Sequence, residues 1–496
     1  MAQALSLGLL LAFLAIQSCI AIELTDHIDL WPMPTSVSHG TQRLYVSKDI
    51  TMSMEGSTYP DGKGILKDAF QRVVDLMKLN HVVDGANPSS FVLTGVNVVV
   101  HSPEDELKFG VDESYNLSVP TAGYPLRVQI EAQTVFGALH ALQDQMRLHA
   151  DTSRHYLPVT VIKKVIDTMA YSKLNVLHWH IVDAQSFPIE IPSYPKLWNG
   201  SYSFSERYTT SDAVDIVRYA ENRGVNVMAE IDVPGHALSW GVGYPSLWPS
   251  DSCKEPLDVS NNFTFGVIDG ILSDFSKVFK FKFVHLGGDE VNTSCWTATP
   301  HIKKWLDDNQ MNVSDAYRYF VLRSQKLAIS HGYDVINWEE TFNNFGDKLD
   351  RRTVVHNWLG EDVAPKVVAA GLRCIVSNQD KWYLDHLDAT WEGFYTNEPL
   401  KGIDDPEQQS LVIGGEVCMW GEQIDASDIE QTIWPRAAAA AERLWTPIEK
   451  IAEDPRLVTS RLARFRCLLN QRGVAAAPVA GYGRTAPYEP GPCVRQ

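Results

Sequence analysis

The feature that most constrains the fold is a rhythm that begins near Asp151, in which a short apolar segment, a polar loop and an amphipathic helix follow one another repeatedly. Parallel strands that are buried on both faces give such continuous apolar runs, and their connections require crossover helices. The pattern predicts seven strands: Asn175–Val182, Val225–Ile231, Phe283–Leu286, Asp334–Asn337, Thr353–Trp358, Leu372–Ser377 and Leu411–Met419. Repeated βα units predict an α/β fold, a (β/α)8 TIM barrel over residues 151–496.

One strand of that barrel is unaccounted for. The place for it is directly before Asp151, where residues 144–150 read Asp-Gln-Met-Arg-Leu-His-Ala and show no strand pattern. A parallel barrel without one strand has two unpaired edges and a core open to water. The sequence therefore predicts a barrel whose first strand is missing.

The segment 22–143 has a different character. The expected strands Phe91–Val100 and Arg127–Glu131 alternate with helices such as Ile65–Leu79, whose apolar residues recur every three or four positions. A chain of 496 residues accommodates a barrel and a second, smaller domain. We expect a small α+β domain at this position.

The first 21 residues have the pattern of a cleaved secretory signal. An apolar run from Ala4 to Ile16 precedes small residues that end at Ala21. The segment lacks Lys and Arg, and a signal anchor is the alternative, although the run is short for a membrane span. The expected location is the secretory pathway, with the extracellular space, the cell surface and the vacuole left open, and we expect no membrane span after cleavage.

Loss of the signal would remove Cys19 from the seven cysteines and leave six, some of which should pair in an oxidising compartment. Five N-x-[ST] sequons agree with that route and favour a glycoprotein: Asn116, Asn199, Asn262, Asn292 and Asn312. The net charge of −18 argues against nucleic acid and anionic membranes as partners, since both require clustered positive charge.

The sharpest motif is Val284–Glu290, an apolar strand that ends in two glycines, Asp289 and Glu290. Adjacent carboxylates in a low-dielectric pocket do not ionise together easily, so one pKa rises and a proton donor lies beside an anion. Cleavage of a glycosidic bond needs that division of roles. The alternative is a polar helix start, with both acids near the positive end of the helix dipole.

Other strand ends carry carboxylates together with aromatic residues, in the segments His178–Asp183, Glu230–His236, Asn337–Glu340, His356–Trp358, Trp382–Asp385 and Cys418–Glu422. Carboxylates hold sugar hydroxyls through charge-assisted hydrogen bonds, and an indole face packs on the C–H face of a sugar ring. For any single tryptophan, core packing is the alternative. Together the segments indicate a glycan pocket at one end of the barrel.

Six motifs of the chain carry a resemblance to a known family: HWHIVD, DVPGHALSW, HLGGDEVNTSCW, INWEE, GGEVCMWGE and WPRAAAAAERLW. Through them the sequence resembles the β-N-acetylhexosaminidases of family-twenty glycoside hydrolases, and most closely their plant members. The match runs from about Leu30 to Cys493. It implies release of terminal N-acetylhexosamine from glycans with retention, through an oxazolinium intermediate formed by the substrate's own acetamido group. It implies no cofactor and no metal.

The resemblance also implies residue roles. Glu290 would protonate the leaving oxygen and later deprotonate water, and Asp289 would orient the acetamido group and stabilise the oxazolinium charge. The positions that match substrate-binding residues of the family are Tyr383 for the acetamido oxygen, Trp338, Trp358 and Trp420 for the pocket walls, Asp385 and Glu422 for hydroxyls, and Asp183 and His236 as supports.

Two disulfides follow from the same resemblance, Cys253 with Cys295 and Cys467 with Cys493. Cys374 and Cys418 would stay buried thiols.

The chain departs from the family directly before Asp151. The family has a further helix, a connection and a first barrel strand with an R-G-L sequence there, and its sugar-gripping arginine has no counterpart in register, since Arg147 lies one place off. An internal deletion, from alternative splicing or from an imperfect gene model, explains this departure.

Two rival functions remain open. One is a metal-dependent amidohydrolase, whose zinc ligands would come from the strand-end histidines His178, His180, His236 and His285. The other is a non-catalytic glycan-binding protein or inactive remnant, because a lost strand damages the scaffold. The sequence also leaves open the natural glycan (N-glycan, chitin fragment or glycolipid), the choice between the gluco and galacto sugars, and the oligomeric state, a homodimer among the alternatives.

Overall fold

The computed structural model describes residues 30–40, 44–79, 92–120, 122, 125–142 and 147–479. The predicted signal peptide and Cys493 lie outside these residues. None of the helices in the described part of the chain has the length and apolar content needed to cross a bilayer.

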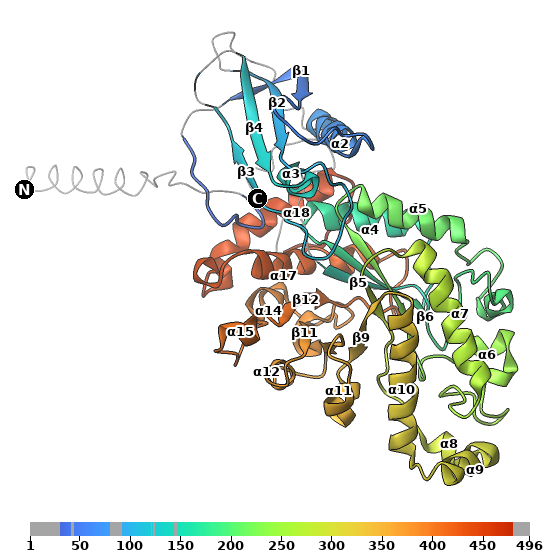
Figure 1. Ribbon diagram of the computed structural model, residues 1–496. Helices are drawn as coiled ribbons and strands as arrows, with labels where there is room; N and C mark the ends of the chain where they lie inside the picture. Colours follow the sequence, from blue (N-terminus) through green and yellow to red (C-terminus); the bar gives the residue numbers. More distant parts are fainter. Residues whose placement is uncertain are drawn as a thin grey trace, which may run out of the picture.

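The amino-terminal part is a small α+β domain (Figure 1). Its sheet has the order β1-β2-β4-β3 and is parallel except for β3 against β4, with β1 (Tyr45–Ser53), β2 (Val92–Val100), β3 (Tyr115–Ser118) and β4 (Leu126–Ala132). Its helices are α2 (Ile65–Leu79) and α3 (Val135–Leu142). Leu66 on α2, Val98 on β2 and Phe136 on α3 share one core, so the apolar spacing that predicted this domain is the spacing that packs it.

A closed barrel of parallel strands follows, with the strand order β5-β6-β7-β8-β9-β10-β11-β12 and β12 paired back to β5. The strands are β5 (Arg147–Asp151), β6 (Val176–Val182), β7 (Asn226–Ile231), β8 (Phe283–His285), β9 (Asp334–Trp338), β10 (Val354–Asn357), β11 (Arg373–Val376) and β12 (Val412–Val417). The barrel and the seven strands expected from the apolar runs are confirmed.

The prediction that the first strand is missing is wrong. β5 pairs in parallel with β6 from Arg147 opposite Val176 to Asp151 opposite His180, and on its other side it pairs with β12. Leu148 and Ala150 join the core between strands and helices, whereas His149 points toward the histidines inside the barrel. The segment did not resemble a buried strand because the inside of this barrel is itself polar.

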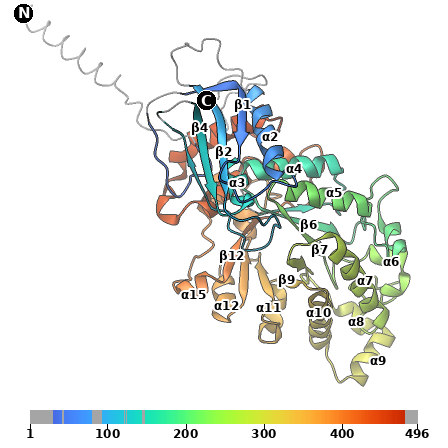
Figure 2. The same cartoon turned by 45° about the horizontal axis from the view of Figure 1, so that its top comes forward.

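Helices cover the outside of the barrel (Figures 1 and 2). The helices that extend over two or more turns are α4 (Val159–Tyr171), α5 (Thr210–Glu221), α7 (Asn262–Val278), α9 (Pro300–Asp308), α10 (Val313–Ser330), α17 (Arg436–Trp445) and α18 (Thr459–Gln471). Shorter ones are α6 (Trp240–Gly243), α8 (Ser294–Ala298), α11 (Glu340–Phe345), α12 (Ala364–Ala369), α13 (Gln379–Trp382), α14 (Trp391–Thr396), α15 (Pro406–Gln409) and α16 (Ile429–Ile433).

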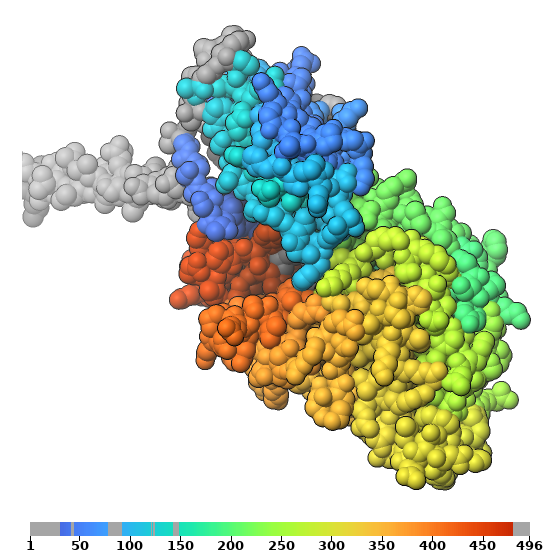
Figure 3. Space-filling view, in the orientation of Figure 1, coloured from blue at the N-terminus to red at the C-terminus, as the bar shows by residue number. Residues whose placement is uncertain are grey.

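The small domain packs against the barrel at the end where the strands begin. The ring of Phe109 meets the edge of Phe283 at 5.0 Å between centroids, and Arg72 Nη2 donates to the carbonyl of Asn222 at 3.0 Å. A cavity of about 330 Å³ lies at this junction and is lined by residues such as Asn175 and Trp445. Figure 3 shows the small domain seated against the rest of the molecule. Because the junction lies where the strands begin, the carboxyl ends of the strands stay available for a site.

The cysteines and sequons agree with the sequence where the chain is described. Cys253 and Cys295 form a disulfide with a Cα–Cα distance of 5.7 Å, which joins the loops that follow β7 and β8. Cys374 and Cys418 are buried free thiols. The pairing of Cys467 with Cys493 stays a prediction. All five sequon asparagines are exposed, and their glycosylation also stays a prediction.

Candidate active site

The carboxyl ends of the barrel strands bring the sequence-predicted residues together. Asp183 follows β6, His236 lies in the loop after β7, Asp289 and Glu290 follow β8, and Trp338 ends β9. The aromatic and acidic residues predicted beyond them lie after β10, β11 and β12: Trp358, Tyr383, Asp385, Trp420 and Glu422. This is the end at which TIM barrels carry their active sites.

The turn after β8 is built on two glycines in left-handed conformations, with φ of 61° at Gly287 and 100° at Gly288. A Cβ atom on Gly287 would lie 1.8 Å from Oδ1 of Asp232. The same Oδ1 accepts a hydrogen bond from the Gly288 amide at 2.9 Å, and Asn337 Nδ2 donates to the Gly287 carbonyl at 2.9 Å. The turn thus requires glycine and is fixed by the neighbouring strands.

Asp289 presents a buried carboxyl group to the site. Burial raises its pKa, while the charge of His236 and a hydrogen bond with Asp232 oppose that rise. The pKa of Asp232 is raised well above its usual range by burial and by the charge of Asp289, so Asp232 is the member of this pair that holds the proton. Asp289 Oδ1 is buried and has no hydrogen-bond partner among the described residues.

Glu290 differs from its neighbour. Its side chain is 61% exposed and its Oε2 lies 3.5 Å from His236 Nε2, in a left-handed backbone conformation with φ of 49°. The hydrogen bond from His236 lowers its pKa against the opposing effect of burial, and the charges of His236 and Arg154 add to the lowering. Asp289 and Glu290 therefore have different pKa values, as expected, but the raised pKa is that of Asp289 and not that of Glu290.

His236 joins the two acids to the rest of the site. Its Nδ1 lies 3.2 Å from Asp183 Oδ1, and its Nε2 lies 3.7 Å from Asp289 Oδ2. Burial would lower the pKa of His236, but the charge of Asp232 and the hydrogen bonds with Asp183 and Glu290 raise it well above the usual range. A protonated imidazole therefore lies between the acids.

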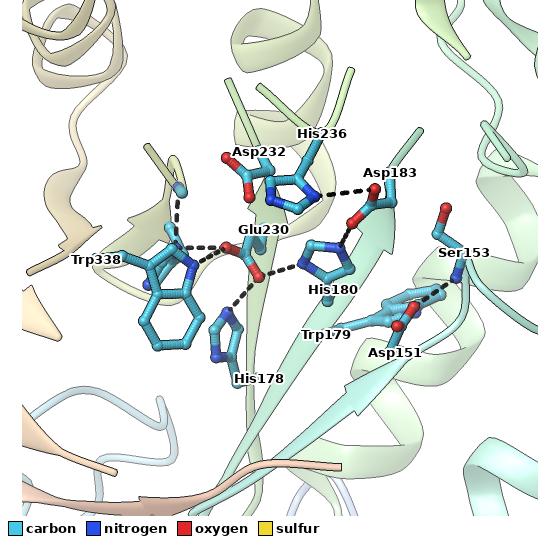
Figure 4. A network of polar contacts seen from close by, with 12 residues as sticks. Asp151, Ser153, His178, Trp179, His180, Asp183, Glu230, Asp232, His236 and Trp338 are labelled. Atoms are coloured by element: carbon cyan, nitrogen blue, oxygen red, sulfur yellow. Dashed lines mark hydrogen bonds and ion pairs between the residues drawn. The ribbon is translucent and has the colours of Figure 1, made fainter. Parts of the chain in front are cut away.

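A buried chain of hydrogen bonds supports Asp183 from below (Figure 4). His180 Nε2 lies 2.9 Å from Asp183 Oδ2, and its Nδ1 lies 2.5 Å from Glu230 Oε2. Glu230 in turn contacts His178 Nε2 at 3.1 Å, and His178 Nδ1 lies 2.7 Å from Glu416. His180 thus links the Asp183 carboxylate to Glu230 in the barrel interior and fixes its position from that side.

Arg154 belongs to the site and was missed by the sequence analysis. Its Nη2 lies 2.8 Å from Asp183 Oδ2, and its Nη1 lies 2.8 Å from Asp151 Oδ2 and 3.4 Å from Glu422 Oε1. The guanidinium also lies 5.0 Å from the ring centroid of Trp420. Arg154 is not the position of the family's R-G-L arginine, whose lack of a counterpart in register stays a prediction, but it places a guanidinium in the pocket. The signal was present, because Arg154 comes three residues after the end of β5, the strand that the sequence did not reveal.

Aromatic side chains form a cluster beside Asp289. Trp338, Tyr383 and Cys418 are buried, and Trp358 and Trp420 pack against them. The rings of Trp358 and Tyr383 are 6.2 Å apart and stacked, with 18° between their planes. Trp338 Nε1 donates to Glu230 at 3.1 Å, which fixes that indole. The cluster makes a flat, apolar wall.

Asp385 and Glu422 offer acceptors at the outer side of that wall. Burial raises the pKa of Asp385 to about 6, and its buried Oδ1 has no hydrogen-bond partner among the described residues. The side chain of Glu422 is 52% exposed. Both are placed to accept hydrogen bonds from a polar ligand.

His149, on β5, is the unexpected residue of the barrel interior. Its ring centroid lies 4.2 Å from that of Trp420 and 4.8 Å from that of His178. Neither ring nitrogen has a hydrogen-bond partner among the described residues. Burial and the charge of His178 lower its pKa well below the usual range, so the imidazole is neutral.

The histidines do not form an open metal site. His180 and His285 each direct Nδ1 to Glu230, at 2.5 and 2.7 Å, and His178 contacts the same carboxylate. Among the described residues, groups of potential ligands have donor atoms within 4.8 Å of one another, His149, His178 and Glu230 being one such group. None of these groups holds more than one of the four histidines of the amidohydrolase hypothesis, His178, His180, His236 and His285. The geometry does not support the amidohydrolase hypothesis.

Comparisons with known proteins agree with this geometry. Residues 147–448 match the model of the glycosyl hydrolase family 20 catalytic domain, and residues 30–144 match a model described as beta-acetyl hexosaminidase like. The chain belongs to glycosyl hydrolase family 20. The first match begins at Arg147, the first residue of β5, and therefore includes all eight strands of the barrel.

Two curated plant relatives align with nearly the whole of this chain. Beta-hexosaminidase 3 of Arabidopsis thaliana is 61% identical, with 96% of each chain covered, and beta-hexosaminidase 1 of the same plant is 51% identical, with 94% covered. Among solved structures, a Flavobacterium johnsoniae chitobiase superposes with a TM-score of 0.77 at 26% identity, over 90% of this chain and 73% of that one. The protein is accordingly a glycoside hydrolase, a plant-type β-hexosaminidase.

Proposed function

We propose that this hydrolase removes terminal non-reducing N-acetyl-D-hexosamine from glycans, with retention, and that the substrate's acetamido oxygen is the nucleophile. The observation that carries the proposal is the buried, unpartnered Oδ1 of Asp289 next to the exposed carboxyl of Glu290. A buried acceptor without a donor is unfavourable by about 1–3 kcal/mol. An acetamido N–H would supply that donor.

In the first step, the N–H of the acetamido group donates to Asp289, which turns the acetamido oxygen toward the anomeric carbon. That oxygen forms a bond to the anomeric carbon while the bond to the leaving oxygen breaks, and protonated Glu290 gives its proton to the leaving oxygen. Because contact with His236 lowers the pKa of Glu290, the fraction of enzyme that carries this proton grows as pH falls. The positive charge of the resulting oxazolinium is stabilised by the Asp289 carboxylate, which stays anionic because Asp232 holds the neighbouring proton.

In the second step, Glu290 takes a proton from water, and the water oxygen attacks the anomeric carbon as the oxazolinium ring opens. Two inversions give retention, and no enzyme carboxylate becomes covalently attached. The aromatic wall would exclude other water, with Trp338 and Trp358 flanking the acetamido group and the Tyr383 hydroxyl donating to its oxygen. Water exclusion favours closure of the oxazolinium ring over direct hydrolysis.

The sugar hydroxyls would be held on the opposite side of the ring. Asp385 has a buried acceptor to which no described residue donates, and Glu422 and Arg154 form an acceptor and donor pair 3.4 Å apart. A hydroxyl both donates and accepts, so it can bridge such a pair. The indole of Trp420 would pack on the face of the ring.

An enzymatic assay tests this mechanism directly. The recombinant protein should hydrolyse an aryl N-acetyl-β-glucosaminide and not the corresponding aryl β-glucoside, and proton NMR should show the β anomer of the released sugar first. Replacing acetyl with mono-, di- and trifluoroacetyl should lower kcat in that order, because the carbonyl becomes a weaker nucleophile. Equal rates across the series would indicate an enzyme nucleophile. Sugar binding by a folded protein without turnover would favour the glycan-binding alternative.

We further propose that the chain matures in the secretory pathway as a glycoprotein, to act outside the cell, at its surface or in the vacuole. The five exposed sequon asparagines support glycosylation. Amino-terminal sequencing of the protein from expressing plant cells should give a start at Ile22, and an N-glycan-removing enzyme should lower its mass. Sedimentation of the same preparation decides between monomer and homodimer.

A further inference from the structure

The neighbouring acids Glu339 and Glu340 follow β9 and face different surroundings. Glu339 is fully buried, and its Oε2 accepts from the backbone amides of Trp358 at 2.8 Å and Leu359 at 3.1 Å. These bonds anchor the loop after β10. Glu340 begins α11, is partly buried and takes no part in that anchor.

Glu340 instead holds the side chain of Trp358. Its Oε2 accepts a hydrogen bond from Trp358 Nε1 at 3.0 Å. The stacked ring of Tyr383 also contacts this indole. The bond therefore selects one rotation of the indole, the one that stands parallel to Tyr383 in the wall of the pocket.

We propose that Glu340 is a positioning residue whose hydrogen bond fixes the indole of Trp358 in the pocket wall. The inference rests on the proposed function, because it assigns a role in binding the acetamido group. Glu340 touches no reacting atom.

The charges that face Glu340 explain why it is neutral. They are Asp289 after β8 and Glu339 on its own turn, while Tyr317 on α10 is a phenol whose own pKa is raised by burial and by the charges of Glu340 and Asp289. Burial and the charge of Asp289 raise the pKa of Glu340 to about 8. Below about pH 8, Glu340 is therefore mostly neutral and adds no second negative charge beside Asp289.

Three variants test this role: E340Q, which stays neutral and keeps an oxygen acceptor, E340L, which removes the bond to Trp358, and E407Q as a matched control in the exposed first turn of α15. The measurements are kcat and KM for the aryl N-acetylglucosaminide, and the Kd of N-acetylglucosamine from tryptophan fluorescence between pH 6 and 9. Thermal melts show that each variant is folded.

We expect the wild-type protein and E407Q to lose up to about tenfold in affinity for N-acetylglucosamine between pH 7 and 9, because Glu340 ionises with a pKa of about 8 and its negative charge then repels that of Asp289 in the same pocket. E340Q should show no such loss through a group at pH 8, and should retain at least about a third of wild-type kcat/KM at pH 5.5. E340L should lose roughly tenfold or more in kcat at every pH, because the wall no longer orients the acetamido group.

Two results would overturn the inference while leaving the proposed function intact: an E340Q variant that loses affinity with pH as the wild type does, or a folded E340L variant with wild-type kcat. A folded wild-type protein that neither hydrolyses the substrate nor binds N-acetylglucosamine would instead contradict the proposed function, and the positioning role with it. If E340L does not fold, the pH profile of E340Q alone decides.

Discussion

Replacing His149 by leucine should stabilise the protein, and more so in acid. His149 lies inside the barrel, 0% exposed, and neither ring nitrogen has a hydrogen-bond partner among the described residues. Leaving a buried polar group without a partner is unfavourable by about 1–3 kcal/mol. Leucine has a similar volume and no polar atom, so His149→Leu should raise the free energy of unfolding by about that amount at pH 7.

The pH dependence follows from the lowered pKa of His149. In the unfolded chain the imidazole takes up a proton below about pH 6.5, whereas in the folded chain it stays neutral. The unfolded state thus binds more protons, and stability falls as pH falls below that value. At pH 5, which is about 1.5 pH units below 6.5, the free energy of unfolding is lower by about 2 kcal/mol, at about 1.36 kcal/mol per unit. The leucine variant lacks this deficit.

Thermal melts and urea titrations at pH 7 and pH 5 measure both effects. His149→Leu should gain about 1–3 kcal/mol at pH 7 and about 2 kcal/mol more at pH 5. The control His101→Leu, at an exposed side chain after β2 whose partner Glu131 is also exposed, should change stability by only about 0.5 kcal/mol. If the substitution of His149 changed stability equally at both pH values, or not at all, the placement of the His149 side chain inside the barrel would be refuted.

Gly287→Ala should lower kcat/KM at least about 100-fold, because its Cβ would lie 1.8 Å from a carboxylate oxygen of Asp232. The control Gly110→Ala, which has open space around it, should leave kcat/KM unchanged in the same assay. His236→Asn should move the alkaline limb of the kcat/KM profile to higher pH, since loss of the imidazolium raises the pKa of Glu290; an unmoved limb would contradict the assigned cause. Loss of the Cys253–Cys295 disulfide, by a double serine variant, should lower stability by up to about 4 kcal/mol in urea titrations, and an unchanged titration would show that it does not constrain the chain.

The apolar runs were sufficient to predict most of the barrel. Strands such as β6 (VLHWHIV) and β7 (NVMAEI) are buried on both faces and are mostly apolar, with few polar residues among them, and their limits were predicted to within one residue. The glycine pair after β8 likewise marked the turn that presents Asp289 and Glu290. These features depend on residues that are neighbours in the sequence, so patterns in the sequence predict them.

The first strand could not be predicted in the same way. Arg147–Asp151 alternates polar and apolar residues because its inward positions face histidines and carboxylates from other strands. A polar barrel interior is a property of all eight strands together, so one segment does not reveal it. The same holds for Arg154 and for the raised pKa of Asp289, which both depend on groups from distant parts of the chain.

The central claim is that this chain, with its complete barrel, carries a working acid and a separate helper of the substrate's nucleophile. Comparing Glu290→Gln and Asp289→Asn with the wild type on an aryl N-acetyl-β-glucosaminide, with azide added as a small nucleophile, tests it most directly. We predict turnover by the wild type, large losses in both variants, and azide capture giving a β-glycosyl azide only where Asp289 is intact. Glycosyl azide of α configuration, or a folded wild type without turnover, would contradict the account.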